Sequence, residues 1–213
     1  MISSYDTLPV GKYLDIQAAA EDKALSAIDL QVRVIAILAD LPERDVLNAP
    51  IAQDREWAAG AEFLNAPAKQ AGRPASRYAL GSFTLIPTLD LRKLTAAQYI
   101  DFQTFAPEGS KRLVELLSVF LVPEGGNYND GYDVLQVQDA IRDALPMSDA
   151  LTLAAFFLNK YAALMRTTLI SSVRAARKIR NKTKRAQAMA EIEAARKTML
   201  GTLSQLAGDG SPR

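Results

Sequence analysis

The residue types best suited to catalysis are scarce in this chain. Its 213 residues include no His and no Cys, so the commonest general base, the thiolate nucleophiles and the usual transition-metal ligands are missing. This excludes Ser-His-Asp triads, Cys-His proteases and most zinc sites. Carboxylate chemistry, lysine chemistry and Mg²⁺ or Ca²⁺ bound by oxygen ligands stay open.

Two Tyr-X-Asp elements form the most site-like pattern. Tyr13 precedes Asp15 by two positions, and Tyr99 precedes Asp101 in the same way. Residues two apart lie on different faces of a helix, which places each pair badly for joint action on one substrate. We therefore expect each tyrosine to bury its ring and each aspartate to cap a helix or pair with Lys or Arg.

The acidic residues elsewhere in the chain do not have the number or spacing of carboxylates that a metal site needs. The loop 127–133 is rich in Asn, Asp and Gly, but with Gly131 as the sixth position of a calcium loop only Asp130 is a correctly spaced carboxylate. Asp139 and Asp143 recur four apart without a metal-binding partner set, as on a solvated helix face. We expect no enzyme, no metal and no cofactor.

Aromatic residues offer one further candidate. Trp57, Phe63, Tyr78 and Phe83 could together form a recognition patch. Large apolar side chains at such positions are more often part of a core, which is the interpretation we favour here.

Charge divides the chain into an acidic and a basic part. Residues 1–150 hold 13 basic and 21 acidic residues, a net charge of −8, whereas residues 151–213 hold 12 basic and 3 acidic residues, a net charge of +9. One uninterrupted basic arm contributes most of the excess: Arg174, Arg177, Lys178, Arg180, Lys182, Lys184 and Arg185. Such asymmetry indicates a charged partner, either protein, nucleic acid or the acidic body of a neighbouring copy. A solvated helix that only aids solubility is the alternative.

A thin apolar stripe follows this basic arm. Its members recur at helical spacing: Ile192, Met199, Leu203 and Leu206. We expect the basic arm to supply charge complementarity to a protein partner and the stripe to supply burial. No aromatic residue follows Ser171, so stacking on single-stranded nucleic acid has no platform there, and nucleic acid is the second choice.

Hydrophobic periodicity predicts a mainly α-helical fold. One β-hairpin is expected at 77–86, where Gly81-Ser82 separates two short apolar runs. No Gly or Pro occurs from Met147 to Leu200, which predicts a long C-terminal helix. The run of Thr, Ser and β-branched residues at 167–173 is the place where a kink or break is most expected, and the sequence leaves open whether the helix is continuous there. Its first half, including Leu153, Phe157 and Leu164, is apolar enough to be buried.

An internal repeat organises the rest of the chain. Leu8–Gln17 and Leu94–Gln103 share Leu, Tyr, Asp and Gln at identical spacing, and the Asp-Val-Leu run at 45–47 recurs at 133–135. We therefore expect a helical bundle of two related modules. The expected divisions are a first module (1–66), a linker with the hairpin (67–92), a second module (93–170), a basic C-terminal helical extension (171–207) and a disordered tail (208–213).

The segment 94–103, the apolar run 116–123 and the loop 128–133 resemble those of tailed-bacteriophage tail assembly chaperone-like proteins, small helical proteins of the tail region. This resemblance implies a non-catalytic protein that binds the tape measure protein or other tail proteins. The alternatives are a structural or adaptor protein of the tail or neck, and a nucleic-acid-binding accessory protein. No stretch predicts a signal peptide or a membrane span, so we expect the host cytoplasm, or the virion for a structural protein, and no membrane partner.

Overall fold

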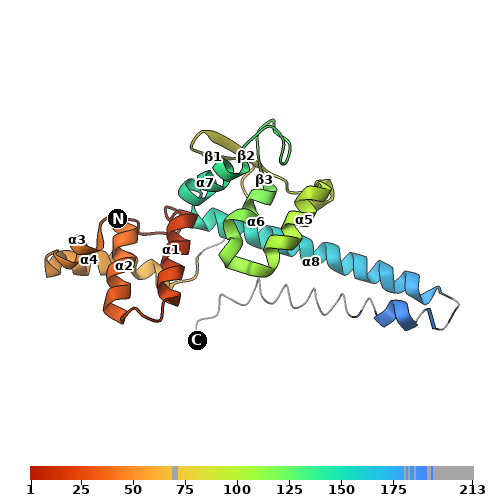
Figure 1. Cartoon of the computed structure of the whole chain (residues 1–213), viewed down its shortest axis with the longest axis horizontal. Coiled ribbons are helices and arrows are strands. Elements are labelled where there is room, and N and C mark those ends of the chain that lie inside the picture. Colours follow the sequence, from red (N-terminus) through yellow and green to blue (C-terminus); the bar gives the residue numbers. More distant parts are fainter. Residues whose placement is uncertain (69–71, 180, 182, 185, 191–192, 194–213) are drawn as a thin grey trace.

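The computed structural model describes residues 1–68, 72–179, 181, 183–184, 186–190 and 193, except for the side chains of residues 165 and 169. This part of the chain is mainly helical with one small sheet (Figure 1), which confirms the predicted fold class. The α-helices are α1 (Val10–Glu21), α2 (Ala27–Ala39), α3 (Glu43–Leu47), α4 (Ile51–Ala61), α5 (Ala96–Phe105), α6 (Leu113–Phe120), α7 (Val134–Ala144) and α8 (Met147–Arg177). Three 3-10 helices also occur, η1 (Glu62–Asn65), η2 (Leu91–Lys93) and η3 (Ala106–Arg112).

Side-chain caps explain where several helices begin. Thr95 and Gln98 form a capping box for α5, each side chain bonding to the other residue's backbone N–H. Ser26 and Asp29 do the same for α2. The Asp133 carboxylate accepts the Leu135 N–H at the start of α7. These bonds satisfy backbone N–H groups that have no partner inside the helix.

The predicted hairpin is present, but it belongs to a three-stranded antiparallel sheet. β1 (Tyr78–Leu80) pairs with β2 (Phe83–Pro87), and Gly81 in the turn has a φ of 58°. β2 also pairs with β3 (Leu121–Pro123), which places Ile86 opposite Val122. The sequence did not predict β3, because it continues the apolar run of α6 and becomes a strand only through its contact with β2.

The main core lies where α1, α6, α7 and α8 meet the sheet. The Phe120 ring stacks on Phe157 with 3.8 Å between centroids, and the Phe102 ring meets Tyr161 edge-on at 4.8 Å. A second, smaller cluster is centred on Ile35 between α2, α3 and α4. In Figure 1, α1–α4 form one end of the body. Helix α7 and the three strands lie at the top of the view, above α8.

The two predicted repeat copies begin their helices at equivalent positions. Val10 opens α1 and Ala96 opens α5, and Ile16 and Phe102 are buried at matching positions. The Asp-Val-Leu runs differ, because Asp45 lies inside α3 whereas Asp133 caps α7. A common origin of the two halves stays a prediction.

Helix α8 runs without a break from Met147 to Arg177. Its 31 residues span about 46 Å at ~1.5 Å per residue. The structure thus answers the question that the sequence leaves open, because the helix is continuous through 167–173. The hydroxyls of Thr167, Thr168 and Ser171 donate to backbone carbonyls one turn earlier, so these polar side chains are satisfied inside the helix. The predicted boundary between residues 170 and 171 lies within this continuous helix.

Only part of the apolar first half of α8 is buried as expected. Leu153, Phe157 and Tyr161 lie in the core, whereas Leu164 is 38% exposed. In Figure 1 the second half of α8 extends beyond the other helices, so Leu164 has less cover than the residues of the first half. No helix among the described residues has the length and apolar character needed to cross a membrane.

Candidate functional site

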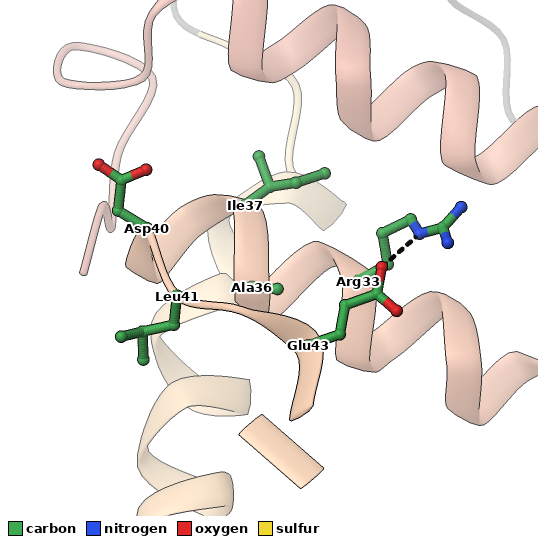
Figure 2. Close-up of a pocket in the computed structure, with 6 residues that line it drawn as sticks. All are labelled: Arg33, Ala36, Ile37, Asp40, Leu41 and Glu43. Atoms are coloured by element: carbon green, nitrogen blue, oxygen red, sulfur yellow. Dashed lines mark hydrogen bonds and ion pairs between the residues drawn. The ribbon is translucent and has the colours of Figure 1, made fainter. Parts of the chain in front are cut away.

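A shallow pocket of about 420 Å³ lies between the end of α2 and the start of α3 (Figure 2). Arg33 and Glu43 form an ion pair across it, with Nε and Oε1 2.8 Å apart. Asp40 lies away from this pair in Figure 2 and meets the Lys12 ammonium at 3.2 Å. Each acid of this pocket thus already faces a cation, which leaves it without a free carboxylate for acid–base chemistry.

A second pocket of about 330 Å³ lies between α1 and α7. Asp15 on α1 accepts a hydrogen bond of 2.8 Å from the Arg142 guanidinium on α7. The helices approach closely at Gly11, where an added Cβ would lie 2.6 Å from Cγ of Arg142. The pocket is therefore the rim of a helix-packing contact. Asp143 also lines it, exposed and without an ion pair among the described residues.

The two Tyr-X-Asp elements do not form a joint site. The Tyr13 hydroxyl accepts from the Gln17 amide at 3.1 Å, while Asp15 pairs with Arg142. Tyr99 is 47% exposed, so its expected burial is wrong. Asp101 accepts a hydrogen bond of 2.7 Å from Tyr128 rather than from a cation.

The loop at 127–133 is a turn, as predicted, and it covers α5. Its left-handed residues are Asn129, with a φ of 58°, and Gly131, with a φ of 78°. Burial and the hydrogen bond to the Asp101 carboxylate raise the pKa of Tyr128 well above its ordinary value of 10.0. This bond fixes the loop on the helix. Among the described residues, no group of three or more Asp or Glu could hold a metal ion.

The aromatic residues do not gather into a patch. Trp57 is half-buried against the small cluster of Ile35 and Val46. Phe63, Tyr78 and Phe83 belong to the main core or pack against it. This agrees with the interpretation of these side chains as core.

The distal half of α8 is the most distinctive exposed feature. It extends beyond helices α1–α7 (Figure 1). Leu164 and Ile170 are 38% and 54% exposed. Residues 164–178 hold four basic residues and no acidic one. All four side chains are exposed and form no ion pair with a described residue: Arg166, Arg174, Arg177 and Lys178.

The structure places part of the predicted basic arm. Arg174 and Arg177 lie in the last turns of α8, and Lys178 is its C-cap. The Lys184 N–H donates to the Asn181 side chain at 3.1 Å, and the Lys184 side chain is exposed. Several predicted binding residues lie outside the described part of the chain: Arg180, Lys182, Arg185, Ile192, Met199, Leu203 and Leu206.

Exposed apolar residues on α7 and α8 were missed by sequence reasoning. Leu135 on α7 is 68% exposed, and Ile170 on α8 is 54% exposed. Each is followed four residues later by a charged residue, Asp139 in α7 and Arg174 in α8. The spacing is visible in the sequence, but solvent exposure depends on which helix face the body covers.

Comparison with known proteins adds no relative to this description. No protein-family model matches the chain, and neither a curated protein nor a solved structure shows significant similarity to it.

Proposed function

We propose that this chain is a non-catalytic protein that works by binding another protein, with the distal half of α8 as its binding surface. One observation carries the proposal. A continuous helix extends beyond the body and combines exposed apolar residues, Leu164 and Ile170, with exposed cations that form no ion pair with a described residue. An exposed amphipathic helix of this kind is a common protein-recognition element.

The rest of the described structure supports a binding role. The two described pockets are shallow, and apart from Asp143 the charged residues that line them are paired. The polar groups of the Tyr-X-Asp elements are used for packing between helices and loops. The resemblance to tail assembly chaperone-like proteins makes assembly of a phage tail the process we propose, with further copies of this chain, tail proteins or the tape measure protein as partners.

A capture experiment with two matched isoleucines tests this proposal. Ile170 on the distal α8 and Ile28 on α2 are both exposed, at 54% and 72%. Tagged full-length protein would be incubated with a nuclease-treated lysate of its natural source. We expect wild type and Ile28→Asp to retain a defined protein, and Ile170→Asp to lose most of it, because a buried carboxylate would oppose apolar contact.

Two outcomes would contradict the proposal. Equal capture by Ile28→Asp and Ile170→Asp would remove the distal α8 as the binding surface. Retention of nucleic acid alone, with affinity falling by orders of magnitude between low and moderate salt, would favour phosphate binding by the basic residues instead. Circular dichroism of each variant controls for folding.

A further inference from the structure

Helix α7 carries an exposed stripe of one apolar and two acidic residues. Leu135 is 68% exposed, and Asp139 and Asp143 follow at steps of four residues. Neither carboxylate has an ion-pair partner among the described residues. The cations that line the adjacent pocket are already paired, Arg142 with Asp15 and Lys12 with Asp40.

The end of α8 carries the same stripe with the opposite charge. Ile170 is 54% exposed, and the exposed cations Arg174 and Lys178 follow at steps of four residues. Each step advances about 6 Å along a helix axis. If the two helices lie parallel, Leu135 faces Ile170, and the two carboxylates face the two cations.

The two stripes of one molecule cannot meet. α8 begins at Met147, three residues after the last residue of α7, Ala144. Arg174 lies 27 residues further along the same unbroken helix, which is about 40 Å from that start. The helix directs its end away from α7 (Figure 1), so the complementary surface for α7 is on another molecule.

We propose that the partner of the distal α8 is helix α7 of a second copy of this chain. This inference rests on the proposed function and names the partner of the same surface. The opposite net charges of residues 1–150 and 151–213, −8 and +9, favour the same association. Because the two surfaces differ, the contact is head-to-tail: it closes into a ring if the rotation between copies allows, and otherwise leaves a free α7 and a free α8 at the ends of an open assembly.

Sedimentation velocity on purified full-length protein, free of nucleic acid, tests this proposal. At low salt we expect the average mass of the wild-type particles to increase with protein concentration. At 0.5 M salt this mass should decrease, because the Debye screening length is then only about a few ångströms. Asp139→Arg and Arg174→Asp should each weaken self-association about tenfold or more, because each replaces an attraction by a repulsion. Glu56→Arg on α4 makes a similar charge change at an exposed residue and should assemble like wild type.

Mixing the two variants gives the sharpest result. Asp139→Arg keeps a native α8, and Arg174→Asp keeps a native α7, so these two helices should pair in an equimolar mixture. The reversed α7 of the first variant and the reversed α8 of the second also carry opposite charges, so the mixture should regain assemblies longer than dimers. The double variant, which carries both reversals, should regain longer assemblies.

Other results would overturn the inference. A wild-type chain that stays monomeric at all concentrations and low salt removes the second copy as partner, while the capture experiment still decides the binding role of α8. Dimers that persist in both single variants, or a mixture that stays monomeric, would rule out contact between α7 and α8. Growth only when nucleic acid is added back would assign the cations to phosphate.

Discussion

The two halves of α8 show how one helix serves two environments. From Met147 to Tyr161 its inner face is covered by α1 and α6, and Leu153 and Phe157 are almost completely buried. From Leu164 to Arg177 the helix extends beyond α1–α7, and the large apolar residues Leu164 and Ile170 meet solvent, whereas Ala176 near its end is buried. The first turn of a helix is unfavourable in free energy, whereas each residue added to an existing helix costs little. The buried half can therefore hold the projecting half in helical form, without any core contact of its own.

The largest difference between the halves should appear in stability. Phe157→Ala removes a ring that stacks on Phe120 in the core and should lower the free energy of unfolding by about 3–5 kcal/mol. Ile170→Ala on the projecting half should change it by less than about 0.5 kcal/mol. Urea denaturation at 0.5 M salt, followed by circular dichroism, measures the two values. Phe157→Leu serves as a milder variant if the alanine variant does not fold. Equal losses of unfolding free energy at Phe157 and Ile170 would contradict the division of α8 into a buried half and an exposed half.

A smaller effect is expected at the point where α8 leaves the body. The Gln103 amide donates a hydrogen bond of 3.0 Å to the Tyr161 hydroxyl, and the Tyr161 ring is buried against Phe102. Tyr161→Phe keeps the ring and removes the hydroxyl, so we expect a loss of about 0.5–1.5 kcal/mol. Gln103→Ala should give a loss of the same size, and the double variant should lose little more than either single one. Strict additivity of the two losses would show that the bond does not couple them.

The smallest effect concerns pH at the buried start of α8. Burial, and secondarily the charge of Asp6, raise the pKa of Asp149 above its ordinary value of 3.8. The folded chain thus binds this proton more tightly than the unfolded chain. The associated stability is present below pH 3.8 and is lost as pH rises through the folded pKa. Asp149→Asn lacks this loss, so its stability relative to wild type should increase from pH 3 to pH 7 in urea denaturation. A difference that is constant across this range would contradict the assignment.

Local sequence signals predicted the helices but not all of their surroundings. The capping box at Thr95 and the turn at Gly81 are encoded by neighbouring residues, and the hairpin turn occurs as expected. β3 was missed because Leu121 and Val122 continue an apolar run, and only pairing with β2 makes them a strand. Leu164 looks like a core residue in the sequence, yet its exposure depends on where the body ends.

The candidate binding surface was predicted in part. The charge asymmetry pointed to the C-terminal region, and Arg174, Arg177 and Lys178 are indeed exposed there. The apolar residues that accompany them in the described structure, Leu164 and Ile170, were not singled out as binding residues. Their role could not be seen in the sequence, because an isoleucine at helical spacing suits a core as well as an interface.

By itself, the sequence determined a mainly helical chain without His or Cys chemistry, with a net negative charge on residues 1–150 and a net positive charge on residues 151–213. These properties depend on composition, on periodicity over a few turns and on caps within a few residues. The tertiary structure decided that β3 joins the hairpin, that α8 passes through residues 167–173 unbroken, and that its end and α7 expose complementary stripes. These features depend on contacts between segments far apart in the chain, and such contacts decide which faces are covered.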